Sequence, residues 1–351
     1  GLNMDPSEVE FRVDTDPQFV RSFLERKTDK VKVVLSTYQS SPVVGEGCEG
    51  LPPFDIGVFD EAHKTAGLEA RALGFALSED NIRIKKRLFF TATPRHIDIR
   101  HRDRYGEFKF ASMDDESIYG PRAHTLSFSA AADLGVICPY KVIISLINKE
   151  MVSDFALKNG ITLVEKDEVG AKWVANQIAL QQAIKKVDAT KVITFQSRVN
   201  LAKELASDSS RGISSFLDGY EVRHVNGKQS AGERTGIIDA FADAPKSILT
   251  NARCLTEGVN IPTVDMVAFI DPRRSPVDVT QAVGRAMRKP RGPTTKKLGY
   301  VLVPLFAGVE DDDDFAKAIE NERFDVVAEV LSALQEHDDV LADIIREIRE
   351  R

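Results

Sequence analysis

Residues 56–63 read Ile-Gly-Val-Phe-Asp-Glu-Ala-His, a stretch in which an apolar run is followed by two adjacent carboxylates. Its apolar half predicts a short buried strand, with Asp60 and Glu61 at the carboxyl end. Adjacent carboxylates at such a place are costly unless they hold a cation or manage a proton. The carboxyl ends of parallel strands also form the usual ligand-binding edge of an open α/β sheet. We therefore expect a ligand site here, and a strand end that is merely acidic is the alternative.

On both sides of this stretch, short β-branched and aromatic runs alternate with segments of helical period. Strands are predicted at 31–35, 56–59, 88–91, 142–147, 191–195, 222–225, 247–250, 266–270 and 300–303. Helices are predicted at 16–26, 68–77, 171–186, 199–206, 231–242, 277–287, 326–334 and 340–348. Such alternation produces βαβ units, and hence parallel sheets covered by helices on both faces. The predicted class is α/β.

The stretch from 105 to 139 lacks long periodic segments and carries several glycines and prolines, which indicates a boundary between two α/β domains. We place the first domain at 1–128 and the second at 129–305. Residues 306–351 are acidic and then helical, so they form a C-terminal helical extension in this scheme. The extension either packs on the second domain or engages a partner.

The composition is that of an ordinary soluble globular protein, with 351 residues, 42% hydrophobic and 29% charged. No apolar stretch is long enough for a membrane span, and the amino terminus lacks a secretory pattern. The three cysteines (Cys48, Cys138 and Cys254) are far apart, which favours reduced thiols and a cytoplasmic location. A net charge of −7 argues against a basic nucleic-acid coat, although a local basic groove remains compatible with it.

A second predicted strand, at 88–91, ends in the hydroxyl residues Thr91 and Thr93. Threonines at a strand end commonly cap the turn that follows. In a parallel sheet they would instead lie beside the acidic strand end and hydrogen-bond whatever the carboxylates bind. Both interpretations are open from these residues alone.

Three polar residues of the second half, Gln281, Arg285 and Arg288, sit on a predicted helix. A spacing of four and then three residues puts them on one face of that helix. Two guanidiniums held together repel each other, so a shared anion such as phosphate is a natural reason for the arrangement. A solvated basic helix is the plainer alternative.

Six motifs occur in an order and spacing that resemble the motif series of the superfamily 2 helicases. They are Thr37-Tyr38-Gln39-Ser40, Asp60-Glu61-Ala62-His63, Thr91-Ala92-Thr93-Pro94, Val192–Phe195 before a helix, Gly258-Val259-Asn260-Ile261-Pro262, and Gln281-x-x-Gly284-Arg285-x-x-Arg288. The resemblance covers residues 31–304 and is nearest to the DEAH-type modules of restriction-modification systems and related bacterial helicases. It implies two RecA-like parallel-sheet domains, the first incomplete, that use ATP and Mg²⁺ to act on nucleic acid.

The resemblance also implies roles for the charged residues. Asp60 would hold Mg²⁺, mostly through water, and Glu61 would activate the attacking water next to the metal. Arg285 and Arg288 would neutralise charge on the γ-phosphate as arginine fingers. Gln281 would sense the nucleotide or its water.

Further roles follow for the remaining motifs. His63, Thr91 and Thr93 would couple the nucleotide site to the nucleic-acid site, and Gly258 and Asn260 would lie near the ribose and Mg²⁺. The nucleic-acid contacts would come from Thr37, Tyr38, Gln39, Ser40, Ser197 and Arg198. DNA is preferred to RNA as the partner, by analogy with restriction systems.

Two departures from the family pattern matter. The family usually has Asp where Asn260 stands, which puts ribose recognition by this residue in question. In addition, the chain contains no Gly-x-x-x-x-Gly-Lys-Ser/Thr sequence, and its one Gly-Lys pair, Gly227-Lys228, precedes Gln229. We therefore expect the chain to begin inside the first domain, to hydrolyse ATP weakly or not at all, and to self-associate through the incomplete first sheet.

Two alternative functions are also compatible with the sequence. A non-catalytic nucleic-acid-binding or scaffolding protein would keep both domains and depend on another chain for ATP chemistry. An α/β metal-dependent hydrolase would use Asp60 and Glu61 alone, but it leaves the paired arginines unexplained.

Overall fold

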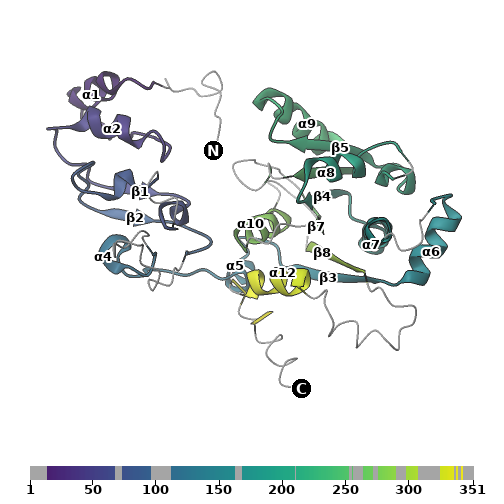
Figure 1. The fold of residues 1–351 in the computed structure, drawn as a ribbon. Coiled ribbons are helices and arrows are strands. Elements are labelled where there is room, and N and C mark those ends of the chain that lie inside the picture. The colour runs from purple at the N-terminus through teal and green to yellow at the C-terminus, as the bar shows by residue number, and fades with distance from the viewer. Residues whose placement is uncertain are drawn as a thin grey trace, which may run out of the picture. The chain divides into compact units, whose positions relative to one another are not determined.

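The structure is a computed structural model that describes residues 14–67, 73–95, 112–162, 168–209, 211–252, 255, 264–271, 276–289, 298–306, 325–335, 337–338 and 341–342. The chain divides into two compact units (Figure 1). One lies within Met4–Thr125 and the other within Leu126–Arg351. Each unit has its own sheet and its own core, and each is described separately below.

The unit from Leu126 onward is built on a six-stranded parallel sheet with the order β3-β8-β7-β4-β6-β5. The strands are β3 (Tyr140–Ile147), β4 (Lys191–Gln196), β5 (Glu221–Asn226), β6 (Ser247–Ala252), β7 (Met266–Asp271) and β8 (Gly299–Phe306). Every residue of β4 and β6 is buried, as continuous β-branched runs in a parallel sheet require. The six strands predicted for this part of the chain are confirmed.

Helices cover both faces of this sheet. They are α5 (Phe128–Asp133), α6 (Lys149–Lys158), α7 (Glu168–Val187), α8 (Val199–Leu205), α9 (Ala231–Asp243), α10 (Pro276–Ala286) and α12 (Asp325–Gln335). Residues of α9, α10 and α12 share one apolar cluster with the sheet, whereas α7, α8 and a 3-10 turn at Ile213–Phe216 share another. The predicted α/β class with helices on both faces is confirmed for this unit.

Helix α12 resolves the alternative left open for the C-terminal extension. It packs against α10 and β8 (Figure 1). Val330, Ala333 and Leu334 are at most 1% exposed and belong to the same apolar cluster as the strands. This part of the extension is therefore built into the core of the second unit.

The two ends of α9 show how local chemistry fixes a helix. At its start, the Ser230 hydroxyl accepts from the Glu233 amide, while the Glu233 carboxylate accepts from the Ser230 amide, which makes a reciprocal cap. At its end, the buried Lys191 ammonium donates to the carbonyls of Phe241 and Ala242 at 2.7 and 2.8 Å. A positive charge at that end also matches the helix dipole, so α9 is held at both termini.

The other unit is smaller and its sheet has two described strands. It contains α1 (Pro17–Glu25), α2 (Ser41–Cys48), β1 (Gly57–Phe59), β2 (Arg87–Phe89), α4 (Glu116–Tyr119) and 3-10 turns at Ala62–Thr65 and Phe75–Leu77. Strands β1 and β2 are parallel, with Gly57 opposite Arg87 and Phe59 opposite Phe89. The core gathers Val44, Phe59, Ala62, Ala76, Ile82 and Ile84 on one side of this sheet.

The opposite side of β1 and β2 carries large apolar side chains that are exposed. Ile56, Val58, Leu88 and Phe90 are 47–64% exposed, and we call these four residues the uncovered face. The sequence predicted buried strands here, and for these side chains that prediction is wrong. The alternation is real, but among the described residues nothing packs on the second face of the sheet.

Two further predictions for this unit need correction. Residues 31–35 form no strand, and Val31, Val33 and Leu35 are 65–89% exposed, because no described strand pairs with them. Of the helix predicted at 68–77, residues 68–72 lie outside the described residues and 75–77 form a 3-10 turn. The helix predicted at 340–348 falls almost entirely outside the described residues.

Two of the three cysteines are described, and Cys48 is half-buried whereas Cys138 is buried. Cys254 lies outside the described residues. Among the helices that the structure describes, none combines the length and the apolar character needed to cross a bilayer.

Candidate functional site

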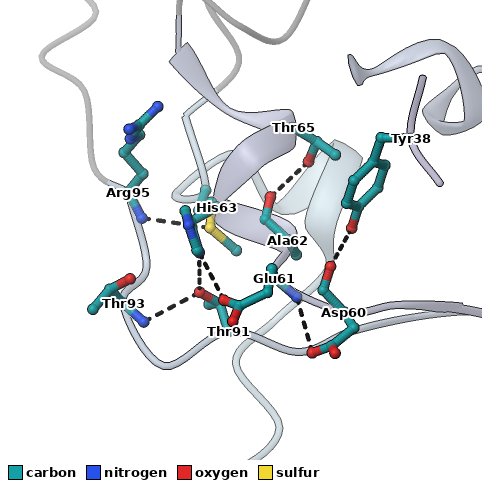
Figure 2. Close-up of polar contacts among 10 residues, drawn as sticks. Tyr38, Asp60, Glu61, Ala62, His63, Thr65, Thr91, Thr93 and Arg95 are labelled. Carbon is teal, nitrogen blue, oxygen red and sulfur yellow. Dashed lines mark hydrogen bonds and ion pairs between the residues drawn. The ribbon is translucent and has the colours of Figure 1, made fainter. Parts of the chain in front are cut away.

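The acidic stretch that opened the sequence forms a tight turn after β1 (Figure 2). Glu61 has a left-handed backbone, with φ 49° and ψ 44°, which costs a residue with a side chain about 1–2 kcal/mol. The Glu61 amide donates to Asp60 Oδ1 at 2.9 Å, and the Ala62 amide donates to the Phe90 carbonyl at 2.9 Å. The turn is thus bonded both to itself and to the chain that leaves β2.

His63 brings the acidic turn and the threonine motif together. Its side chain is 5% exposed, and its Nδ1 lies 3.0 Å from Thr91 Oγ1 and 3.4 Å from Glu61 Oε2 (Figure 2). Thr91 Oγ1 also accepts from the Thr93 amide at 3.1 Å. The predicted neighbourhood of Glu61, His63 and Thr91 at one sheet edge is therefore present.

Thr93 lies on the same edge but points its hydroxyl elsewhere. The residue is 6% exposed, and its Oγ1 makes no hydrogen bond with any residue that the structure describes. The two threonine hydroxyls therefore differ in their contacts, because only that of Thr91 contacts both His63 and the Thr93 amide.

The Thr37–Ser40 motif precedes α2 and also reaches the acidic turn. The Tyr38 hydroxyl donates to the Asp60 carbonyl at 2.6 Å, and its ring stacks on Phe59 with 6.5 Å between centroids. Burial, and then the Asp60 carboxylate, raises the pKa of Tyr38 to about 12, so the hydroxyl keeps its proton at neutral pH. Thr37, Gln39 and Ser40 are exposed, so they are the members of this motif open to a ligand.

Arg285 and Arg288 occupy different environments in the second unit. Arg285 is in the last turn of α10 and is 5% exposed, whereas Arg288 is exposed and lies beyond the helix end at Ala286. Burial, and then repulsion by Arg288, lowers the pKa of Arg285 to about 10, which leaves it charged at neutral pH. Gln281 is half-buried on the same helix. The prediction that both arginines sit on the helix is wrong for Arg288.

The end of α10 is tied to its surroundings by the backbone. The Cys138 amide donates to the Met287 carbonyl at 2.8 Å, and the Lys289 ammonium donates to the Gly135 carbonyl. Gly299 begins β8 so close to this end that a Cβ there would lie 2.4 Å from the Ala286 carbonyl oxygen. Arg285 therefore stands on a rigidly held helix terminus.

The remaining sequence-predicted residues follow β4 or lie outside the described part. Ser197 Oγ donates to Asp271 Oδ2 at the end of β7, and Arg198 is exposed at the start of α8. Gly258 and Asn260 fall outside the described residues.

Asp60 and Arg285 belong to different units, so their meeting across a cleft stays a prediction.

The adjacent carboxylates of Asp60 and Glu61 fit a hard cation such as Mg²⁺. This ion is typically bound by one or two carboxylates together with waters and substrate phosphate oxygens. In the described part of the chain no three His, Cys, Asp or Glu side chains cluster as a metal site would require for full protein coordination. Carboxylate oxygens are ligands that Mg²⁺ shares with phosphate, whereas structural zinc is usually held by Cys and His.

Sequence reasoning missed two residues at this site, Thr65 and Tyr119. The Thr65 hydroxyl donates to the Ala62 carbonyl at 2.8 Å, and the Tyr119 hydroxyl lies 3.0 Å from Thr65 Oγ1. Each is a single hydroxyl with no periodic signal, and 54 residues separate them in sequence.

Comparisons with known proteins bear on both units. The helicase conserved C-terminal domain family matches residues 175–290. A probable helicase of African swine fever virus (isolate Tick/Malawi/Lil 20-1/1983) is 26% identical over 321 residues, which cover 88% of this chain and 32% of the viral protein. The ATP-dependent RNA helicase has1 of Schizosaccharomyces pombe is 30% identical over 145 residues, 41% of this chain and 23% of the yeast protein. The chain thus spans about a third of the length of the viral relatives.

Two solved structures are similar over most of the chain. The ATP-dependent Type ISP restriction-modification enzyme LlaBIII bound to DNA gives a TM-score of 0.71 at 26% identity, covering 90% of this chain and 22% of the enzyme. A nuclease-deletion mutant of the Type ISP enzyme LlaGI, in complex with a DNA substrate mimic, gives 0.57 at 27% identity, covering 95% and 22%. The predicted RecA-like α/β fold is confirmed. The motif order, the matched domain and these neighbours all support the predicted relationship to superfamily 2 helicases, including those of restriction systems.

Proposed function

We propose that this chain is the motor part of an ATP-dependent helicase or translocase that acts on DNA. The observation that carries the proposal is the acidic turn, where the Glu61 carboxylate is held beside His63, which in turn contacts Thr91. Glu61 can act as a general base in this arrangement, and its position then depends on His63 and, through His63, on the segment that carries Thr91. The similarity to LlaBIII and LlaGI, whose structures contain DNA or a DNA substrate mimic, supports DNA as the partner.

In this proposal the two carboxylates have separate roles. Asp60 holds Mg²⁺ through water, and Glu61 accepts a proton from the water that attacks the γ-phosphate. The metal, when bound, neutralises charge on the phosphate oxygens. The exposed position of Asp60 at the strand end supports this division, because a hydrated cation needs room.

The second unit supplies positive charge. Arg285 and Arg288 reach the γ-phosphate as arginine fingers, a contribution worth a thousandfold or more in rate, roughly, in related reactions. Gln281 contacts the nucleotide or its water from the same helix. Gly258 and Asn260 lie near the ribose in this proposal.

Nucleic acid binds to exposed residues of both units. Thr37, Gln39 and Ser40 in the first unit, and Arg198 in the second, can reach a phosphodiester backbone. Ser197 and Tyr38 belong to the same segments, but their hydroxyls are engaged with Asp271 and the Asp60 carbonyl. Backbone contacts of this kind do not depend on base sequence, as a translocating motor requires.

The finer organisation belongs to the same proposal. We take 1–128 as the first domain, 129–305 as the second and 306–351 as an extension that belongs to the second, and we take the location as cytoplasmic. The uncovered face of β1 and β2 supports self-association through the first unit, because large exposed apolar patches commonly mark contact surfaces.

A test measures ATP hydrolysis with and without single- and double-stranded DNA. It uses both this chain and a longer form of the protein that includes a phosphate-binding loop. We expect the 351-residue chain, which contains no such loop sequence, to bind ATP poorly and hydrolyse it barely. The longer form should be stimulated by DNA, and Glu61→Gln should abolish turnover while ATP binding persists.

The outcomes separate the alternatives. A longer form that binds DNA but never hydrolyses ATP supports the non-catalytic nucleic-acid-binding protein. Substantial steady-state hydrolysis by the 351-residue chain alone contradicts the role given to the loop.

A further inference from the structure

Four aromatic rings lie in a continuous row beneath the acidic turn. Tyr38 stacks on Phe59, Phe59 stacks on Phe89 with 4.9 Å between centroids, and Phe89 meets Tyr119 edge to face at 5.0 Å. We call Tyr38, Phe59, Phe89 and Tyr119 the aromatic row. Phe59 and Phe89 are paired residues of β1 and β2, so the row runs across both strands on the core face of the sheet.

Each end of the aromatic row carries a hydroxyl that acts on the acidic turn. The Tyr38 hydroxyl donates directly to the Asp60 carbonyl at 2.6 Å (Figure 2). Tyr119 acts through Thr65, whose Oγ1 donates its single proton to the Ala62 carbonyl at 2.8 Å. Tyr119 is therefore the donor in the 3.0 Å contact between the two hydroxyls.

The two carbonyls that receive these hydrogen bonds flank Glu61. A left-handed residue other than glycine persists only where its surroundings hold it in place. Here Tyr38 bonds the carbonyl of the peptide that precedes Glu61, whereas Tyr119 bonds the Thr65 hydroxyl, which in turn bonds the carbonyl of Ala62. Thr65 and Ala62 are 0% exposed and Tyr119 is 9% exposed, so water does not compete at that end.

The ends of the row also belong to two different functional segments. Tyr38 lies inside Thr37–Ser40, the segment proposed to contact nucleic acid. Tyr119 ends α4, and the chain then turns at Gly120, with φ 70°, and runs to Leu126, where the other unit begins. The turn that holds Glu61 thus receives one rigid contact from each segment.

We propose that Tyr38 and Tyr119 are positioning residues that hold Glu61 in its left-handed conformation and relay to it movements of the two segments they come from. The relay rests on the proposed function, since it assumes a nucleic-acid contact at Thr37–Ser40. The positioning itself rests only on the geometry above.

The first experiment uses the 351-residue chain without any ligand. Hydrogen–deuterium exchange of the amides in residues 60–66 is compared for the wild type, Tyr38→Phe and Tyr119→Phe. Each variant keeps its ring and loses one hydroxyl, so we expect exchange about fivefold faster, the factor for one ordinary hydrogen bond. Tyr220→Phe is the matched control, because that hydroxyl also donates to a backbone carbonyl, of Ala189 at 2.7 Å, but in the other unit.

Two variants at Thr65 sharpen this test. Thr65→Val removes the hydroxyl through which Tyr119 acts together with its bond to Ala62, so it should speed exchange at least as much as Tyr119→Phe, whereas Thr65→Ser should keep exchange slow. Unchanged exchange at 60–66 in both tyrosine variants, with the chain folded, overturns the positioning role.

The second experiment adds single-stranded DNA to the same chains. In the wild type, saturating DNA should slow exchange at 60–66, while Tyr38→Phe at saturating DNA should lose that slowing. Weaker DNA binding by Tyr38→Phe, with normal slowing at saturation, overturns the relay and makes Tyr38 a strand contact only. Failure of the wild type to bind DNA counts against the proposed function, and the ligand-free experiment still decides the positioning role.

A longer, active form separates positioning from binding. Both tyrosine variants should lower kcat for ATP hydrolysis at saturating DNA at least tenfold and leave the KM for ATP unchanged, because they displace Glu61 without touching the nucleotide. A raised KM at unchanged kcat would assign these tyrosines to nucleotide binding instead.

Discussion

The amide of Cys138 donates to the carbonyl of Met287 at 2.8 Å, which joins the end of α10 to the chain just before β3. This bond lies two residues from Arg285. The end of α10 is therefore held by a hydrogen bond to a distant part of the chain. This bond also fixes the position of the buried Arg285 in the last turn of the helix.

Gly299 tests how tightly that helix end is held. Gly299→Ala should destabilise the second unit by about 1–3 kcal/mol, as overpacking does, because the new Cβ would lie 2.4 Å from the Ala286 carbonyl oxygen. Gly284→Ala on α10 is the control, since nothing lies within 4 Å of its Cβ position, and it should gain up to about 1 kcal/mol from helix propensity. Urea unfolding of the two variants gives both values, and equal effects would contradict the close packing.

Arg285 is expected to lower the stability of the second unit while being needed for ATP turnover. A pKa lowered from 12.5 to about 10 corresponds to about 3 kcal/mol against the charged form, to which burial contributes most and repulsion by Arg288 contributes the rest. Arg285→Met should therefore leave the second unit as stable as the wild type or more so, and it should abolish ATP turnover in an active form. The exposed Arg288→Gln should change stability by less than about 0.5 kcal/mol. Strong destabilisation by Arg285→Met in thermal unfolding would show that the guanidinium is structural.

Thr91 should matter through its hydroxyl rather than its shape. Thr91→Val removes the contact to His63 Nδ1 and the acceptor of the Thr93 amide, so we expect a loss of about 1–3 kcal/mol in the first unit. Thr91→Ser retains the oxygen and should lose much less. Equal unfolding midpoints for the two variants would contradict this role.

His224 should make the second unit sensitive to acid. Burial, and then the charge of Lys203, lowers its pKa below the ordinary 6.5, although the hydrogen bond with Thr250 opposes the shift. The unfolded chain then binds more protons than the folded one, so stability present above pH 6.5 is lost as the pH falls below it. His224→Gln should flatten the dependence of the unfolding free energy on pH between 7 and 5. Parallel curves for wild type and His224→Gln would rule the group out.

The uncovered face should control self-association. Val58 and Leu88 are 64% and 47% exposed on paired strands, so Val58→Thr with Leu88→Thr should lower the apparent mass in concentrated solution. Leu157→Thr is the control, because Leu157 is 83% exposed on α6 of the other unit. A wild-type chain that stays monomeric in light scattering at high concentration would contradict the proposal.

The second unit was the easier one to predict. Strands such as β4 and β6 are buried on both faces, so their residue types alone mark them as central strands of a parallel sheet. Residues 31–35 have the same composition but no described strand beside them. Periodicity reports which side chains alternate, and it does not report whether a neighbour covers the second face.

The site was predicted in part for a similar reason. Asp60, His63 and Thr91 follow strands that are neighbours in the sheet, so the strand pattern brought them together. The Tyr119–Thr65 contact depends on how α4 folds back, which no local pattern encodes. The position of Arg288 beyond α10 likewise depends on the tertiary bond at Met287.

The burial of Val330, Ala333 and Leu334 has a practical consequence for anyone who expresses the second unit alone. A gene cut at residue 306 would omit side chains that fill the hydrophobic interior beside α10, and the product should be poorly folded or insoluble. Cloning through Ala342 retains α12 together with the Asp338 carbonyl that accepts the Ala342 amide. The recombinant boundary should therefore follow the packing and not the last strand.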